Sequence, residues 1–367
     1  MTGSVSGGSL LRVFEELAEL SRVGSVSGHE ADTVAVLERR WRQWLDETRV
    51  SVLGNFIGLA RGLGPMPRPT VAAAAHMDCI GFMVTRVEEG GFLRIVTVGG
   101  ADRRLLLGQE VDVMGRRPLT GVVGAKPPHL STPEERDKLL PLDELYVDTG
   151  LPESEVRELV PLGTVVLHRQ EVTQLRNGWI AGRYLDDIAG LAVLGVALAE
   201  LRESVHPADF YAVGTIGEEA GRYPGATTAA FELRPNVAIA VDVTFGAYPS
   251  QDDPTGTFPL GSGPAIGVGP NCHPKLVNFL RDLAGEFDIP TSLEVMPGST
   301  GTDAWGMQTV RGGIPTATLC VPLRYMHTPV ETLSLEDIRN AGRLLALTVS
   351  RVTWTFVEGL SCYDRTP

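Results

Sequence analysis

Short apolar runs alternate with helical patterns over most of the chain. Four runs have apolar or small residues at consecutive positions, which is typical of strands buried on both faces of a parallel sheet. These runs are Thr70–Ala75, Phe210–Ile216, Val237–Val243 and Thr316–Val321. Helical patterns separate or follow them, at Ile188–Leu201, Pro274–Phe287 and Leu335–Phe356. The alternation predicts an α/β domain with a mostly parallel sheet.

The N-terminal segment predicts two packing helices. After a Gly/Ser-rich tail at residues 1–8, Ser9 is a candidate N-cap for a helix with apolar positions such as Leu10 and Val13. A second helix is expected from Glu30 to Asp46, because apolar residues fall on one stripe of it.

The stretch 79–171 has a different pattern. It contains short alternating or apolar strands separated by Gly-containing turns, which is typical of a small β-rich unit. The expected strands span residues 81–87, 92–98, 110–115, 120–125 and 163–168. We therefore expect residues 79–171 to form a domain inserted into a discontinuous α/β domain made of residues 1–78 and 172–367.

Composition and charge narrow the function classes. The 367 residues are 43% hydrophobic and 21% charged, which is enough for a large core and shows no signature of disorder. Acids outnumber bases 45 to 32, a formal charge of −13, so nucleic acid and anionic membrane surfaces are poor partners. None of the three lysines, Lys126, Lys138 and Lys275, follows a Gly-rich loop, so a phosphate-binding loop is absent.

The sequence also predicts a cytoplasmic location. The first 20 residues lack the basic start and apolar core of a signal peptide, and no run of 18 apolar residues could span a membrane. The cysteines are scattered and form no CxxC pair, which excludes a thiolate zinc site and a disulfide framework.

Polar residues gather where the predicted strands end. His76 and Asp78 follow the first strand, and Glu218 and Glu219 follow the second. The third strand carries Asp242, the fourth leads to Arg324 and His327, and Asp186–Asp187 precede a helix. Ligands of open α/β sheets bind outside the carboxyl ends of the strands, so we expect these residues at one site.

Each acidic group also has an ordinary structural explanation. An Asp before a helix is more often an N-cap than a ligand, which applies to Asp186 and Asp187. Asp242 is harder to explain in this way, because a carboxylate inside VAIAVDV loses its hydration unless a cation or a donor compensates. Two histidines and several carboxylates at one sheet edge favour a metal site.

The residue types indicate which metals fit. Imidazole and carboxylate without thiolate suit Zn, Co or Mn. Two His and three acids exceed what one catalytic zinc needs, whereas two ions sharing a carboxylate would use all of them. In the Glu218–Glu219 pair, one carboxylate could bind a metal and the other could act as a general base.

Five motifs resemble, in order and spacing, the M42 family of dinuclear metallo-aminopeptidases, which includes glutamyl aminopeptidases and tetrahedral, dodecameric peptidases. The motifs are AHMDCIGFMV, RYLDDIAG, TIGEEAG, AVDVT and RYMHTPVE. The resemblance covers nearly the whole chain. It implies a metallopeptidase domain of the phosphorylase/hydrolase-like α/β class, with an inserted PDZ-like or barrel domain at 79–171 through which the chain dimerises and can build dodecamers.

The resemblance also implies a role for each site residue. One metal would be held by His76 and Asp242, the other by Glu219 and His327, with Asp186 bridging the two. Glu218 would be the general base. Asp78 would hydrogen-bond the imidazole of His76 and fix its tautomer.

Three positions depart from the family pattern. Cys79 stands where an acid is common, Ile188 where an Arg is frequent, and Trp305 where a small residue is usual. None of them removes a metal ligand, so we expect them to affect substrate preference rather than metal binding.

The combined expectation is an aminopeptidase that removes N-terminal residues from peptides with two Zn or Co ions, or Mn. The alternative is a two-metal amidohydrolase or deacylase that acts on N-acyl amino acids or other small amides, because the fold alone cannot select the substrate. A glycosidase would give no role to His76 and His327. An assembly protein with a vestigial site would not need all five ligand residues.

Overall fold

Four parallel strands form the centre of a large mixed sheet, and they correspond to the four apolar runs. The computed structural model describes residues 4–130, 132, 138–249 and 256–361. In sheet order, the central strands are β12 (Asp209–Thr215), β3 (Thr70–His76), β13 (Val237–Phe245) and β16 (Thr316–Arg324). Nearly every residue of β13 and β16 is buried, which explains why their sequences do not alternate.

Shorter strands extend this sheet on both sides, mostly in the antiparallel direction. They are β1 (Glu47–Val50), β2 (Phe56–Ala60), β17 (Glu331–Ser334), β11 (Trp179–Gly182) and β10 (Thr173–Gln174), with a side branch of β14 (Ala265–Val268) and β15 (Ser292–Val295). The part of the chain that the structure describes thus contributes eleven strands to the sheet. The branch starts at β16, to which β14 is antiparallel, and β15 then pairs with β14.

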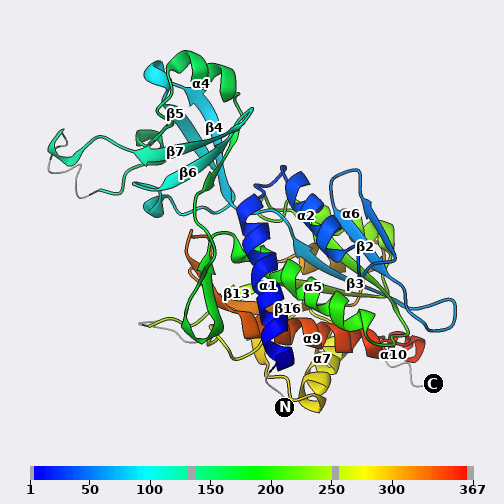
Figure 1. Ribbon diagram of the computed structural model, residues 1–367. Coiled ribbons are helices and arrows are strands. Elements are labelled where there is room, and N and C mark those ends of the chain that lie inside the picture. The colour runs from blue at the N-terminus through cyan, green and yellow to red at the C-terminus, as the bar shows by residue number, and fades with distance from the viewer. Residues whose placement is uncertain (1–3, 131, 133–137, 250–255, 362–367) are drawn as a thin grey trace.

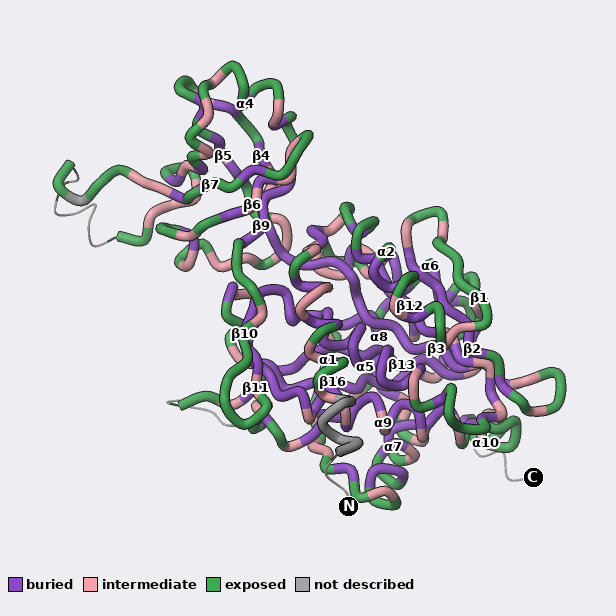
Figure 2. The backbone as a smooth tube through the Cα atoms, viewed as in Figure 1, coloured by how far each residue is buried: buried purple, intermediate pink, exposed green. Residues whose placement is uncertain are grey.

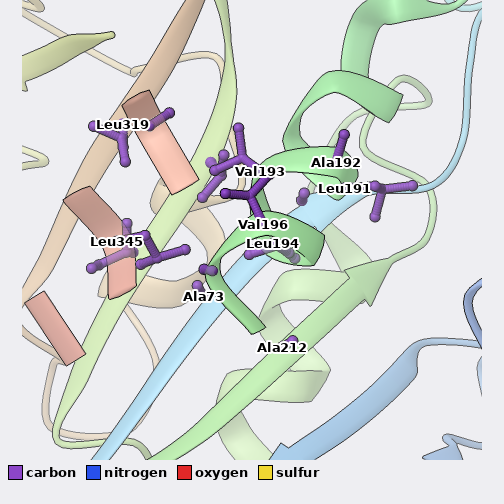
Figure 3. Close-up of a cluster of buried hydrophobic side chains, with 14 of the residues drawn as sticks. Ala73, Leu191, Ala192, Val193, Leu194, Val196, Ala212, Leu319 and Leu345 are labelled. Carbon is purple, nitrogen blue, oxygen red and sulfur yellow. The ribbon is translucent and has the colours of Figure 1, made fainter. Parts of the chain in front are cut away.

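Helices cover both faces of the sheet. One layer consists of α1 (Ser4–Val23), α2 (Ala31–Trp41), α5 (Leu185–Arg202), α7 (Pro274–Glu286) and α9 (Leu335–Arg351), and the other of α6 (Pro224–Leu233) and α8 (Ala304–Gln308). Ala73 packs in the α5 layer, whereas Ala72 and Ala74 pack in the α6 layer, as expected for alternate residues of one strand. Figure 3 shows Ala73 in one cluster of buried side chains with Val193, Leu194 and Val196 of α5.

The run of alanines in β3 is explained by the packing of helices on both of its faces. Small side chains on both faces of this strand let the two helical layers approach it closely. α5, which carries Asp186 and Asp187 in its first turn, contacts both β3 and β13. The sheet therefore holds this helix next to the strands that end at the predicted site.

Six strands close into a separate barrel, as expected for the insert. In barrel order they are β4 (Gly81–Val87), β5 (Leu93–Val98), β8 (Tyr146–Asp148), β7 (Pro118–Gly124), β6 (Glu110–Met114) and β9 (Val165–His168). The barrel has its own core, which includes Phe82, Val111 and Val156, the last from α4 (Glu153–Leu159). Figure 1 shows that the barrel stands apart from the large sheet. Figure 2 shows that most of the buried residues lie in the domain that contains this sheet.

Some expectations about single elements were wrong. α1 begins at Ser4 rather than Ser9, so part of the Gly/Ser-rich segment is helical, because packing of the later turns on α5 outweighs the low helix propensity of glycine. α2 ends at Trp41, before Asp46. The helix expected at Leu335–Phe356 is broken after Arg351, because the Thr353 side chain accepts the Phe356 N–H and starts α10 (Trp354–Glu358). β8 was not predicted.

Single 3₁₀ turns complete the described elements, at Glu89–Gly91, Arg103–Leu105, Pro128–Leu130, Leu142–Glu144 and Arg176–Gly178. Among the described residues, no helix is long and apolar enough to cross a membrane.

Candidate metal centre and active site

The parallel register brings the predicted site residues to one edge of the sheet. His76 is the last residue of β3 and lies beside Thr215, the last residue of β12. Glu218 and Glu219 follow β12 within one turn, and Asp242 lies near the end of the adjacent strand β13. His76, Asp186, Glu218, Glu219, Asp242 and His327 all line one cavity of about 220 Å³.

Asp186 and Asp187 enter the site from the first turn of α5 and have different roles there. Both have backbone angles outside the helical range. Asp187 accepts hydrogen bonds from the backbone N–H of Gly190, at 2.9 Å, and of His76, at 3.3 Å. The N-cap interpretation therefore applies to Asp187, whereas the Asp186 side chain is free to face the histidines.

Asp186 lies between two imidazoles. Its Oδ1 is 3.2 Å from Nε2 of His76, and its Oδ2 is 3.3 Å from Nε2 of His327. Nε2 of His327 is also 3.3 Å from Oε1 of Glu219. Each oxygen of one carboxylate thus faces a different histidine, which is the arrangement that a carboxylate shared by two cations requires.

The tautomer of His76 follows from its other ring nitrogen. Nδ1 is 2.7 Å from the backbone carbonyl oxygen of Asp78, and a carbonyl can only accept a hydrogen bond. Nδ1 therefore carries the proton, and in the neutral ring Nε2 presents a lone pair to Asp186. A lone pair and a carboxylate oxygen repel each other unless a proton or a metal ion lies between them.

Two further observations show that the residues suit a cation. Oε1 of Glu219 is buried, and apart from its ion-pair contact with Nε2 of His327 it has no hydrogen-bond partner among the described residues. Asp242 is only 6% exposed, and its carboxylate lies in a group with His76 and Asp187 whose ligand atoms are all within 4.8 Å of one another. Asp186 and Glu219 form a second such group with His76. The donor set is imidazole and carboxylate, as Zn, Co or Mn prefer.

The electrostatics of the cluster point the same way. Burial raises the pKa of Asp242 well above its usual range, and neighbouring Asp187 raises it further. The pKa of His327 is raised to about 11, because its imidazole contacts Asp186 and Glu219. Burial acts against ionisation of Asp186, but His327 and His76 hold its pKa well below the usual range. These contacts favour the protonated form of His327, so the acids of the cluster attract positive charge.

Glu218 differs from the candidate ligand acids in its place relative to the possible metal-binding groups. It lines the cavity but does not belong to either group of potential ligand atoms. Burial raises its pKa to about 8, and the nearby charges of Asp303 and Asp186 add to this against the opposing effect of His76. A carboxyl with a pKa near neutrality that is not needed for binding a cation is suited to proton transfer.

Asp78 contacts His76, but through its backbone. The carboxylate oxygen Oδ1 is 3.8 Å from Nδ1 of His76, so the imidazole hydrogen bond is made by the carbonyl instead. The carboxylate accepts the backbone N–H groups of Glu218, at 3.0 Å, and of Glu219, at 3.1 Å, and the hydroxyl of Ser27. Asp78 thereby fixes both the His76 ring and the turn that carries the two glutamates.

Glu331 is a buried site residue that the sequence did not identify. Its Oε2 accepts the backbone N–H of Asp186, at 3.0 Å, and its Oε1 accepts that of His327, at 2.7 Å. One carboxylate therefore holds the backbone of two residues that are far apart in the chain. Its position at the end of the RYMHTPVE motif, as the first residue of β17, was the available signal.

Asp303 is the second such residue. It is buried behind the cluster and accepts the hydroxyl of Thr215 at 2.5 Å. Burial raises its pKa to about 6. It lies in the GTDAWG segment, which directly follows none of the four central strands, so the rule that ligands gather at strand ends did not point to it.

The three departures from the family pattern lie off the cavity. Cys79 and Ile188 are buried in hydrophobic clusters, and Trp305 is 41% exposed on the surface. None of them is among the residues that line the cavity. This gives no support to the expectation that they change substrate preference by direct contact.

Comparison with known proteins gives consistent matches. The family model described as M42 glutamyl aminopeptidase matches residues 54–344. The lysyl aminopeptidase of Pyrococcus furiosus is 39% identical over 82% of this chain and 85% of that protein. The structure of an aminopeptidase from the archaeon Desulfurococcus kamchatkensis superposes with a TM-score of 0.89 at 32% identity, covering 97% of this chain and 99% of that one. The TET1 peptidase of Pyrococcus horikoshii, which can assemble into a tetrahedron or a large octahedral shell, gives a TM-score of 0.80 at 29% identity, covering 93% and 100%.

Substitution of Glu331 tests whether it positions the candidate metal ligands. Glu331→Gln replaces one acceptor oxygen with an NH₂ group, so either Asp186 or His327 loses a backbone hydrogen bond. We expect the affinity for Zn²⁺ to fall about 10- to 100-fold, as is typical for partners that orient metal ligands. Competition with a chromophoric chelator measures this affinity. The control is Glu358→Gln, which changes an exposed acid on α10. If Glu331→Gln bound Zn²⁺ as tightly as the wild type, Glu331 would not position the candidate ligands.

Proposed function

Because the chain belongs to the M42 glutamyl aminopeptidase family, we propose that it is a dinuclear metal-dependent aminopeptidase that removes N-terminal residues from peptides. Its family membership makes it a hydrolase of peptide bonds. The position of Asp186 carries the proposal of two metals, because its two oxygens face His76 and His327 separately. A single-metal site would not need this carboxylate between two imidazoles.

The five candidate ligands divide into two sets around Asp186. His76 and Asp242 would hold one ion, Glu219 and His327 the other, and Asp186 would be shared. Zn²⁺ or Co²⁺ fits these donors best, with Mn²⁺ as the further candidate. Two such ions supply Lewis acidity, which polarises the scissile carbonyl and lowers the pKa of water.

Glu218 is the proposed general base. Its carboxylate lines the cavity beside the ligand residues and has a raised pKa. It would take a proton from the attacking water and return it to the leaving amine. Asp78 supports this role, because its carboxylate accepts the backbone N–H of Glu218. This hydrogen bond fixes the backbone position from which the Glu218 side chain extends.

The barrel is the proposed surface for self-association. It belongs to the insert, which we place at residues 79–171 between the two parts of the catalytic domain, 1–78 and 172–367. The barrel stands apart from the sheet that carries the site (Figure 1), so it can contact another chain without covering the cavity. Through this surface the chain would form a dimer, and such dimers could build a dodecamer, the state in which a related TET peptidase, PhTET1-12s, fills its crystal's asymmetric unit. The cytoplasmic location remains a prediction.

The substitution Glu218→Gln tests the general base. It keeps the size and polarity of the side chain but removes the proton acceptor. We expect kcat to fall at least ~10²-fold, the usual contribution of general-base catalysis, while the metal content stays near that of the wild type. Steady-state assays with an aminoacyl-p-nitroanilide and elemental analysis measure the two quantities.

Glu38→Gln, an exposed acid on α2, serves as the control for this substitution. A Glu218→Gln variant that hydrolyses the substrate at the wild-type rate would remove Glu218 from the mechanism.

A blocked substrate separates the aminopeptidase from the alternative amidohydrolase or deacylase. An aminopeptidase recognises a free α-amine, which the cavity carboxylates would attract, so acetylation should abolish turnover. We expect a free dipeptide to be hydrolysed and its N-acetylated form to be hydrolysed at least ~100-fold more slowly, as followed by chromatography of the products. Faster release of acetate than of amino acid would favour the alternative.

A further inference from the structure

The cavity has a second wall that the proposed metal centre does not use. Beyond the candidate ligands and Glu218, it is lined by a mostly uncharged set of residues with a single carboxylate. The main members are Thr244, Phe245, Glu294, Met296, Thr302 and Met326. No Lys or Arg lines the cavity. Glu294 therefore faces this space without a Lys or Arg among the lining residues to pair with it.

Glu294 is held in place by the sheet. It lies on β15, in the branch outside the four strands that end at the metal site. Along β15, Leu293 and Val295 are exposed, whereas Glu294 points inward. Its Oε1 accepts the hydroxyl of Thr244 at 2.7 Å. Thr244 is two residues after Asp242 on β13, so both of these side chains are on the same face of that strand.

The other oxygen of Glu294 has no partner. Oε2 is buried and makes no hydrogen bond within the described residues. Burial raises the pKa of Glu294, and the Thr244 hydrogen bond opposes this. A buried carboxylate oxygen without a donor is unfavourable, and a charged donor that enters the cavity would relieve this cost.

We propose that Glu294 determines specificity by binding the cationic side chain of an N-terminal lysine or arginine, an inference that rests on the proposed aminopeptidase function. The ammonium or guanidinium group would donate to Oε2. The aliphatic part of the side chain would lie along Phe245, Met296 and Met326, as long basic side chains do when only their ends are polar. A substrate with an N-terminal Asp or Glu would meet like charge at this wall and find no cation in it.

The assay uses the full-length enzyme loaded with Zn²⁺ or Co²⁺ and a panel of Lys-, Arg-, Leu- and Glu-p-nitroanilides. For the wild type, we expect kcat/KM to be highest for Lys and Arg and lowest for Glu. In Glu294→Gln, the ratio of kcat/KM for Lys over Leu should fall about 10- to 100-fold, the range for losing a hydrogen bond to a charged group.

Two further variants make the assay specific for charge. Glu294→Asp keeps the carboxylate and should retain a preference for Lys over Leu, whereas a loss as large as in Glu294→Gln would indicate packing rather than charge and overturn the proposal. Asp282→Asn, which changes an exposed acid on α7, should leave all ratios unchanged. Thermal unfolding of each variant shows that it is folded.

The outcomes separate this inference from the proposed function. A wild type that prefers Leu or Glu overturns the role of Glu294 but leaves the aminopeptidase intact. An equal fall for all substrates in Glu294→Gln also overturns it, because that result would place Glu294 at the α-amine. A wild type that hydrolyses none of the four substrates contradicts the aminopeptidase function itself.

Discussion

The site depends on the repulsion between buried carboxylates at the carboxyl edge of the sheet. Asp186, Asp187, Glu219 and Asp242 approach one another in a region with two imidazoles and no lining Lys or Arg. Burying so much negative charge costs several kcal/mol per group unless cations compensate. Asp186, with one imidazole at each of its oxygens, is the centre of this arrangement. The surrounding structure keeps these groups from separating.

The positions of the candidate ligands are fixed by hydrogen bonds to the backbone, and not only by contacts among the ligands themselves. Glu331 holds the backbone of Asp186 and His327, Asp78 holds that of Glu218 and Glu219, and Asp187 holds that of His76. These acids face N–H groups, whereas the ligand candidates face one another. Neighbouring acids in the sequence thus divide into those that bind the backbone and those that are left for a cation.

Much of this could be predicted from the sequence, because the signals are local. The apolar runs that end at His76 and that contain Asp242 identify central strands, and the parallel register follows from the alternation with helices. The chain's order of strands then brings His327 to the same edge. The missed residues depend on contacts between distant segments. Glu331 holds two loops separated by more than a hundred residues, and Glu294 lies on a branch strand whose partner no periodicity indicates.

The same limit applies to Asp78, whose hydrogen bond to the His76 ring is present but is made by its backbone carbonyl. Spacing alone places it beside His76, but whether the carbonyl or the carboxylate contacts the ring depends on the turn that follows β12.

The most direct test of the account is the number of metal ions that the protein binds. Elemental analysis after incubation with Zn²⁺ or Co²⁺ and exhaustive dialysis should give two ions per chain in the wild type and no more than one in Asp186→Ala. One ion or none per wild-type chain would contradict a centre built around a shared carboxylate.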